Sequence, residues 1–411
     1  MVDVKPFSGL YYYNKFSKSN NVSKFLNRAF YLNSNTGLNL KTNAADEFNF
    51  KLLQKKCDYD AINVKFKAWL EDGALTVSGL PSFYVCSVSY KIAGNIYESK
   101  GVFGAFKLPR KEDCEIISVE NYDDVEKKFI FDYLNRVNLQ ISPVFALYEE
   151  DEKEIVNLLD NACAGPCCEK FKHLNTIYKV WEVKNADLIL RIREYFKKIN
   201  KLYVINGFAF YNAVVENNSI NKGRKIDYIL TFFMEKSSEV LAVLPFHRVF
   251  SMNMFDLQEC LNKFGTYFDY FELRSLSAMR SKMFSLKREN KTVFGFYAEE
   301  SFGVLVLKDD FKFGEEFDKF KHVRNLDAFI VNELIVSKLL NLSSVDVQCT
   351  SSALEAKSAV DRGDGCLALF LNSERLTDLI EFSHSGEKMP YKFAGFFPNS
   401  LDGLVLYSMY D

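Results

Sequence analysis

Two residue types are scarce in this chain of 411 residues: tryptophan occurs twice and proline eight times. Long apolar runs are also missing, because no stretch of about 18 apolar residues occurs, and we therefore expect no membrane span. Neither sign of charge is in excess, since 52 basic residues stand against 54 acidic ones. Bulk electrostatics therefore gives no indication of a nucleic-acid partner.

Regularly spaced cysteines are missing as well. Nine cysteines are scattered along the chain, an odd number that does not read as a disulfide framework. The first residues, Met1 to Pro6, contain no apolar segment typical of a secretory signal. Together these absences predict reduced thiols and a cytoplasmic location.

One group of cysteines is a candidate metal site: Cys163-Ala164-Gly165-Pro166-Cys167-Cys168, with His173 nearby. A structural zinc site needs four well-spaced ligands, and two adjacent cysteines supply them poorly. We therefore expect no metal here, and we expect a turn that joins a helix to a strand.

The residues that are abundant predict a globular protein with a sizeable core. Phenylalanine (39) and tyrosine (22) are frequent, hydrophobic residues make up 48% and charged residues 26%. Segments 83–90 and 97–108 alternate in polarity around Ala93-Gly94-Asn95, which predicts a β-hairpin. Strand, helix, strand and helix are expected in turn between residues 178 and 216, a rhythm typical of an α/β core.

The remaining segments complete a fold of the α/β class, with mixed sheets, flanking helices, β-hairpins and a small helical-plus-strand C-terminal module. We expect an N-terminal arm over residues 1–45, a mixed α/β core over 46–320 and the C-terminal module over 321–411, packed on the core. The other expected helices are 61–71, 125–137, 151–160, 326–341, 352–359 and 374–384. The other expected strands are 144–147, 228–235 paired with 240–244, and 293–297 paired with 304–308.

Several blocks of the sequence resemble one family. The chain ends in Met389-Pro390-Tyr391-Lys392-Phe393-Ala394-Gly395-Phe396-Phe397-Pro398-Asn399, followed by Gly403-Leu404-Val405. Upstream blocks read W-L-E-D-G-A at Trp69–Ala74, P-V-F-A-L-Y at Pro143–Tyr148, L-P-F-H-R-V at Leu244–Val249 and C-L-A-L-F-L-N at Cys366–Asn372. In order and spacing, from about Ala61 to the end, these blocks resemble the domain of unknown function family 1015.

The chain departs from that family where the family concentrates its polar residues. The family's A-D-G-H-H-R-Y motif stands at Ile205–Tyr211, where Asn206 replaces the aspartate and Phe208-Ala209-Phe210 replace His-His-Arg. Gly207 and Tyr211 are retained. Of the family's H-E-x-T motif only Glu120 is left.

These replacements remove side chains that transfer protons or bind anions. Histidine moves protons near neutral pH and arginine forms a fork for carboxylate or phosphate, whereas phenylalanine can only exclude water and fill volume. An alternative is purely structural: a strand ends at Ile205, Gly207 adopts a conformation closed to other residues, and Phe208 and Phe210 cap the core. Because residues i and i+2 of a helix face different ways, we expect one ring to be buried and the other to face the former cleft.

Two polar positions of the family remain. His247-Arg248, after a strand and a proline, could present a cation to an anionic ligand, or Arg248 could be a structural residue bound to a carboxylate and backbone carbonyls. Lys392 stands where the family's M-P-x-K run has its lysine, but Phe393 and Ala394 replace the hydroxyl residues after it, so structural use is favoured.

The family's polar motif is similar to that of ParB-like and free serine kinase proteins, which implies an ancestral nucleotide-dependent reaction. We expect a catalytically degenerate homologue, a pseudoenzyme that acts as a cytoplasmic binding or interaction protein without cofactors. Asn206, Gly207, Tyr211 and Lys392 are its expected ligand-binding residues, and its partner is an unidentified small molecule or protein. The alternative is an ATP- and magnesium-dependent kinase of a small metabolite such as serine, with Glu120, His247 and Arg248 as catalytic residues.

Overall fold

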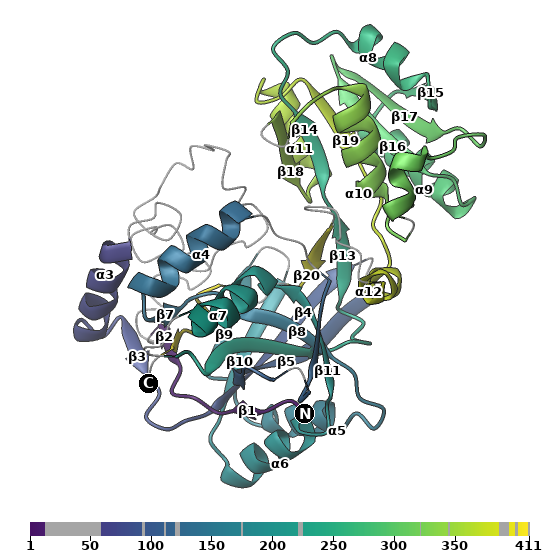
Figure 1. Ribbon diagram of the computed structural model, residues 1–411. Helices are drawn as coiled ribbons and strands as arrows, with labels where there is room; N and C mark the ends of the chain where they lie inside the picture. Colours follow the sequence, from purple (N-terminus) through teal and green to yellow (C-terminus); the bar gives the residue numbers. More distant parts are fainter. Residues whose placement is uncertain are drawn as a thin grey trace. The chain divides into compact units, whose positions relative to one another are not determined.

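The computed structural model describes residues 1–12, 59–92, 95–110, 112–119, 124–173, 176–220, 225–320, 322–343, 346–385, 394–398 and 402–409. Within these residues the chain forms two compact units (Figure 1). The first unit holds residues 1–12, 59–242 and the described residues from 396 onwards, and the second holds 243–395. No helix among the described residues is long and apolar enough to cross a membrane.

The core of the first unit is a mixed sheet, in which nine strands of the described chain take part. In spatial order they are β6 (Glu115–Ser118), β11 (Lys201–Asn206), β8 (Val144–Tyr148), β12 (Tyr228–Glu235), β5 (Asn95–Lys107), β4 (Phe83–Ile92), β10 (Thr176–Val183) and β9 (Glu169–His173), with β1 (Val4–Lys5) beside β5. Two pairs, β11 with β6 and β12 with β8, are parallel. Every residue of β8 is buried, as expected for a central strand covered on both faces.

Helices cover this sheet. They are α4 (Asp124–Arg136), α5 (Glu154–Ala162), α6 (Ala186–Phe196) and α7 (Phe208–Ile220), and α3 (Tyr59–Glu71) packs beside α4. The side chain of Asn185 caps α6 by accepting from the amide of Leu188. Figure 1 shows α5 and α6 together on one side of the sheet and α4 beside α7 on the other.

The first twelve residues correct the expected N-terminal arm. β1 pairs with β5, and β2 (Leu10–Tyr12) pairs with β3 (Leu75–Val77). Val2, Val4, Phe7 and Leu10 are buried, so this segment is part of the core. The strands are too short to show a period in the sequence, which is why they were not expected. The rest of the expected arm, residues 13–45, lies outside the described residues.

The second unit is built on an antiparallel sheet. Its order over the described strands is β15 (Phe268–Leu273), β17 (Ser301–Leu307), β16 (Val293–Ala298), β19 (Leu367–Phe370), β14 (His247–Phe250) and β18 (Val347–Thr350). Helices α9 (Leu276–Arg288) and α11 (Ala353–Asp361) pack on one face, where Met279, Met283 and Ala356 join the core of the unit. The other described helices are α8 (Leu257–Phe264), the 3-10 helix η4 (Glu315–Phe320), α10 (Asp327–Phe329), which continues as a π-helix over Ile330–Leu339, and α12 (Leu376–His384).

The mixed α/β class is confirmed, and the hairpin of β4 and β5 and the pair of β16 and β17 form as expected. Other pairings differ. β12 does not pair with the next strand, β13 (Ala242–Pro245), which pairs with β20 (Ala394–Phe397). The strands of the expected strand–helix–strand–helix order, β10 and β11, are both present, and β8, β12, β5 and β4 lie between them in the sheet.

The two units also differ from the expected boundary near residue 320. β14 belongs to the second sheet, where Val249 pairs with Ala368. The last described strand, β21 (Tyr407–Ser408), returns to the first unit and pairs with β7 (Leu139–Gln140). Strand pairing between segments far apart in the chain therefore sets the boundaries of the units. The order of elements along the chain does not predict such pairing.

Candidate functional site

The motif position at 205–211 lies at the junction of β11 and α7. Gly207 makes the turn between them with φ of 85°, a conformation that side chains other than glycine rarely adopt. A Cβ atom at this position would lie 3.1 Å from the Cα atom of Val144 on the neighbouring strand β8. The amide of Tyr211 donates to the carbonyl oxygen of Gly207 over 3.1 Å and closes the first turn of α7. The expected role of Gly207 in the backbone is confirmed.

Two aromatic side chains lie against each other at the start of α7. The rings of Phe208 and Tyr211 have centroids 5.8 Å apart and an interplanar angle of 14°. The positions that α7 buries are Ala209, Ala213, Val214 and Asn217. The expectation for Phe208 and Phe210 was wrong, because both are half-buried and neither is a core residue. The small side chain of Ala209, between them, takes the position against the sheet.

The electrostatics of this segment are those of a neutral surface. Burial, and secondly Cys114, raise the pKa of Tyr211 to about 12, so its phenol stays protonated at neutral pH. Asn206, which ends β11, is half-buried and carries no charge. From Asn206 to Tyr211 there is no group that exchanges a proton near pH 7. The segment can stack on a flat ligand and can form neutral hydrogen bonds.

His247 and Arg248 lie in β14, in the second unit, and both are buried. His247 Nδ1 accepts from the amide of Leu371 over 3.2 Å, and burial, then Arg248 and Arg280, lower the pKa of His247 to about 3. Arg248 is 1% exposed; it donates to the carbonyl oxygen of Phe246 over 2.8 Å and to Asn332 Oδ1 over 3.3 Å. These contacts, one to a backbone carbonyl oxygen and one to an amide oxygen, fit the structural alternative for Arg248.

The other expected site residues are divided. Asn206, Gly207 and Tyr211 belong to the first unit, and His247 and Arg248 belong to the second. Glu120 and Lys392 lie outside the described residues. The cysteine cluster lies in the turn between α5 and β9, as expected, where Trp181 Nε1 donates to the carbonyl oxygen of Gly165 over 2.9 Å. Over the described ranges, no group of three or more His, Cys, Asp and Glu side chains is arranged to hold a metal ion.

Sequence reasoning missed a cluster of charged residues in the second unit. Lys287 Nζ lies 3.4 Å from Asp327 Oδ1 and 3.9 Å from Glu374 Oε2. Glu374 Oε1 also accepts from the backbone amide of Asp327 over 3.1 Å, at the start of α10. Burial raises the pKa of both carboxyls, although Lys287 and Asn372 oppose the shift at Asp327. Asn372 stands in a block that resembles the family, and this was the available indication of the cluster.

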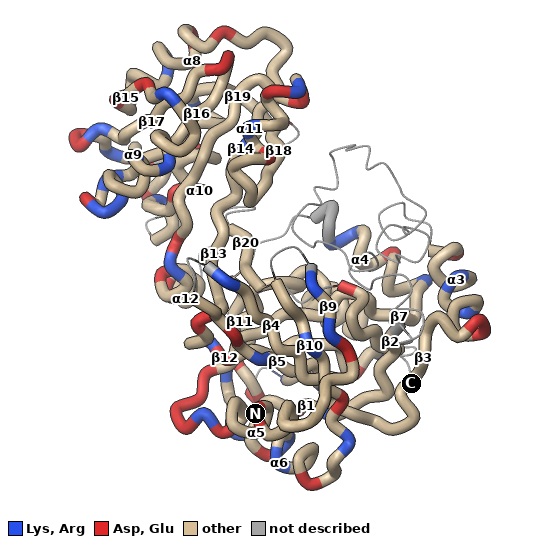
Figure 2. The backbone as a smooth tube through the Cα atoms, turned by 180° about the vertical axis from the view of Figure 1, so that it is seen from behind, with Lys and Arg blue, Asp and Glu red and all other residues tan. Residues whose placement is uncertain are grey.

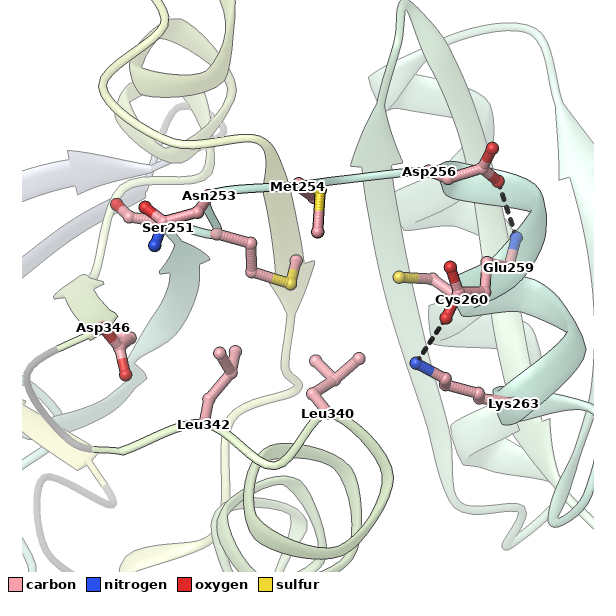
Figure 3. A pocket seen from close by; sticks show the side chains of 11 residues that line it. Ser251, Asn253, Met254, Asp256, Glu259, Cys260, Lys263, Leu340, Leu342 and Asp346 are labelled. Atoms are coloured by element: carbon pink, nitrogen blue, oxygen red, sulfur yellow. Dashed lines mark hydrogen bonds and ion pairs between the residues drawn. The ribbon is translucent and has the colours of Figure 1, made fainter.

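A second feature that the sequence did not indicate is an open hollow of about 340 Å³ beside α8 (Figure 3). Cys260 and Leu340 point into it from α8 and from the end of the π-helix, and Met254 on its rim is 94% exposed. Its carboxylates already have partners: Asp256 caps α8 through the amide of Glu259. The hollow offers space and thioether or leucine surface, but no group positioned for catalysis.

Comparisons with known proteins identify the family. A family model described as a protein of unknown function (DUF1015) matches residues 33–329. The chain belongs to this family. The match ends before the C-terminal blocks that also resemble DUF1015, from Cys366 onwards. No curated protein matches the chain.

Solved structures with some likeness to the chain include relatives of low identity. A conserved hypothetical protein from Pyrococcus furiosus is 10% identical, with a TM-score of 0.37, over 74% of this chain and 93% of that one. A free serine kinase in complex with AMP is 11% identical, with a TM-score of 0.38, over 75% and 91%. SbnI from Staphylococcus aureus with a C-terminal truncation is 6% identical, with a TM-score of 0.37, over 73% and 85%. All three TM-scores are low, and we draw no functional conclusion from them.

Proposed function

We propose that this DUF1015 member is a catalytically degenerate homologue, a cytoplasmic protein that binds a ligand or partner without turning it over. The observation that carries the proposal is the stacked pair of Phe208 and Tyr211. Phe208 stands where the family motif carries its first histidine, Tyr211 is the tyrosine that the chain keeps, and Gly207, also kept, makes the turn before them. Gly207 and Tyr211 are kept, while the motif's groups for proton transfer and anion binding are replaced.

The class of ligand follows from the surface. Two half-buried rings that lie nearly parallel favour a flat aromatic or heterocyclic group, which stacks on them. Asn206 and the protonated phenol of Tyr211 add neutral hydrogen-bonding groups. A highly charged ligand would find no ionic partner between residues 206 and 211. The ligand is therefore a flat, uncharged group, either free or carried by a partner.

The alternative, an ATP-dependent kinase of a small metabolite, has less support. It would use His247 as an acid or base and Arg248 as an anion clamp. His247 has a pKa of about 3 and accepts a backbone hydrogen bond, so it stays unprotonated at neutral pH. Arg248 is buried against Phe246 and Asn332 within its own unit. These contacts favour a structural role for both side chains over a catalytic one.

Calorimetric titration with three probes tests the proposal: adenosine, ATP and ribose 5-phosphate. We expect adenosine to bind and ribose 5-phosphate not to bind. ATP should bind less than about ten-fold more tightly than adenosine. Phe208→Leu keeps the apolar volume but removes the ring. It should weaken the binding of adenosine about ten-fold, which corresponds to the free energy of one base–aromatic stack. Phe129→Leu is the matched control, because Phe129 is an exposed ring on α4.

Two results would contradict the proposal. ATP binding more than about a hundred-fold tighter than adenosine would reveal an anion clamp. Equal affinity of the Phe208→Leu and Phe129→Leu variants for adenosine would place the ligand elsewhere.

A further inference from the structure

Helix α9 of the second unit and the residues just before it carry cations that form no ion pair with described carboxylates. From Arg274 to Arg288 the chain contains five basic residues and no acidic one, in a protein whose net charge is −2 (Figure 2). One of them, Lys287, pairs with Asp327 and Glu374. The other four are exposed and form no ion pair with another described residue: Arg274, Arg280, Lys282 and Arg288.

Two large aromatic rings are exposed beside these cations. Phe284 on α9 is 65% exposed and Phe271 on the edge strand β15 is 50% exposed. The guanidinium of Arg288 lies 6.0 Å from the centroid of the Phe284 ring, and Lys282 Nζ lies 5.9 Å from that of Phe271. Exposed rings next to unpaired cations are a composition typical of interaction surfaces, where aromatic and arginine side chains dominate binding.

Three of these side chains form a stripe along the helix. Arg280, Phe284 and Arg288 are spaced four residues apart, so they lie on one side of α9 over about 12 Å. Met279, Met283 and Leu286 point the other way, into the core against the sheet. We call the stripe of Arg280, Phe284 and Arg288 the α9 surface.

The helix itself does not account for the α9 surface. Arg288 lies in the last turn, where a cation complements the helix dipole. Arg274 precedes the N-cap Ser275 at the opposite end, where a cation opposes the dipole, and the first turn carries no acidic residue. Arg280 lies past the first turn, so the dipole does not account for it either. Phe284 is excluded from the core because the opposite side of the helix already fills it.

Acidic residues limit how far an anionic partner can extend. Leu273, before α9, pairs with Phe302, next to the β16–β17 turn that carries Glu299 and Glu300. The edge strand β15 also exposes Asp269 and Glu272, and Glu289 is exposed directly after Arg288 at the end of α9. A long polyanion would meet these carboxylates, whereas a short anionic segment would lie on α9 alone.

We propose that the α9 surface docks an acidic amphipathic helix of a partner protein. Carboxylates one turn before and one turn after an apolar residue of that helix pair with Arg280 and Arg288, and the apolar residue covers Phe284. This surface is separate from the segment at 206–211, and neither proposal depends on the other.

Fluorescence anisotropy with a labelled helical peptide of about 18 residues tests the proposal. The peptide carries Glu, Leu and Glu at successive four-residue intervals on one face, and its reversed form carries Lys in place of both Glu. We expect the full-length chain to bind the Glu peptide. Arg280→Glu with Arg288→Glu should weaken binding by at least about ten-fold and should make the Lys peptide the better ligand. Phe284→Ser should weaken it about ten-fold as well.

Matched controls are Arg191→Glu on α6 and Phe129→Ser on α4, which make the same changes at exposed helical positions of the first unit. They should leave binding unchanged. The proposal is overturned if the wild-type chain does not bind the Glu peptide, or if the controls weaken binding as much. Tighter binding of a labelled single-stranded oligonucleotide of similar length would overturn it in favour of a nucleic-acid surface.

Discussion

The rings of Phe208 and Tyr211 lie 5.8 Å apart and within 14° of parallel at the first turn of α7. In the family motif, the first of these positions belongs to histidine and the second to a tyrosine that this chain keeps. This chain therefore has a flat apolar surface at a position where the family motif has a titratable group. Since the burial of the pair raises the pKa of Tyr211 to about 12, the surface stays uncharged across the physiological range.

Gly207→Ala should destabilise the first unit more than a Gly→Ala change at a positive φ in open space. The φ of 85° strains any side chain, and the new Cβ atom would also crowd Val144 Cα at 3.1 Å. Gly363→Ala is the matched control, because Gly363 has φ of 78° and open space around it. In urea titrations we expect a loss of about 1 kcal/mol for the control and about 2–3 kcal/mol for Gly207→Ala. Equal losses would show that the contact with Val144 relaxes freely.

His247 should make stability fall in acid. Its pKa is lowered to about 3 in the folded chain, chiefly by burial and then by Arg248 and Arg280, against 6.5 for an ordinary histidine. Below pH 6.5 the unfolded chain takes up a proton that the folded chain does not. The contribution of His247 is therefore complete above pH 6.5 and is lost as pH falls towards 3, with a slope of up to about 1.4 kcal/mol per pH unit.

Unfolding free energies of the wild type and of His247→Asn, measured from pH 7 to pH 4, isolate this contribution. Other carboxyl and histidine titrations are common to both chains and cancel in the difference. The difference between the two should shrink as pH falls. A difference that does not vary with pH would mean that His247 reaches solvent.

The sequence predicted local structure better than pairing. Alternation and Ala93-Gly94-Asn95 predicted the β4–β5 hairpin, and the glycine at 207 predicted its turn, because both depend on neighbouring residues. The burial of Arg248 depends on Asn332, and the place of β14 depends on the pairing of Val249 with Ala368. Such contacts join segments more than 80 residues apart, and no local period encodes them.

The candidate site shows the same limit. The loss of polar groups at 206–210 is visible in the sequence, but the half-burial of both Phe208 and Phe210 is not. Helical geometry alone places the two rings on different sides of α7. It does not show that Ala209, between them, occupies the position against the sheet.

Lys287→Met should destabilise the second unit, and more so at pH 8 than at pH 5. Lys287 is the cation that Asp327 and Glu374 share, and the pKa values of both carboxyls are already raised. Without the lysine the pKa values of both carboxyls in the folded chain rise further. Ionising the carboxyls at higher pH then costs more in the folded chain than in the unfolded one, so stability falls as pH rises. Because Lys287 is partly exposed, we expect only about 1–2 kcal/mol at pH 8.

Lys282→Met on the same helix is the control, since Lys282 is exposed and pairs with no described carboxylate. It should change the unfolding free energy by less than about 0.5 kcal/mol at either pH. A loss for Lys287→Met that is the same at pH 5 and pH 8 would indicate lost packing of the lysine stem, with no electrostatic part.

The central claim is that this chain binds without catalysing, and a turnover assay tests it most directly. Purified chain is incubated with radiolabelled ATP, magnesium and serine, and phosphoserine and ADP are measured beside a sample without protein. We expect neither product above that blank, because no acid, base or anion clamp remains at 206–210. Nucleotide turnover by the wild-type chain that Glu120→Gln abolishes would contradict the claim and establish the kinase.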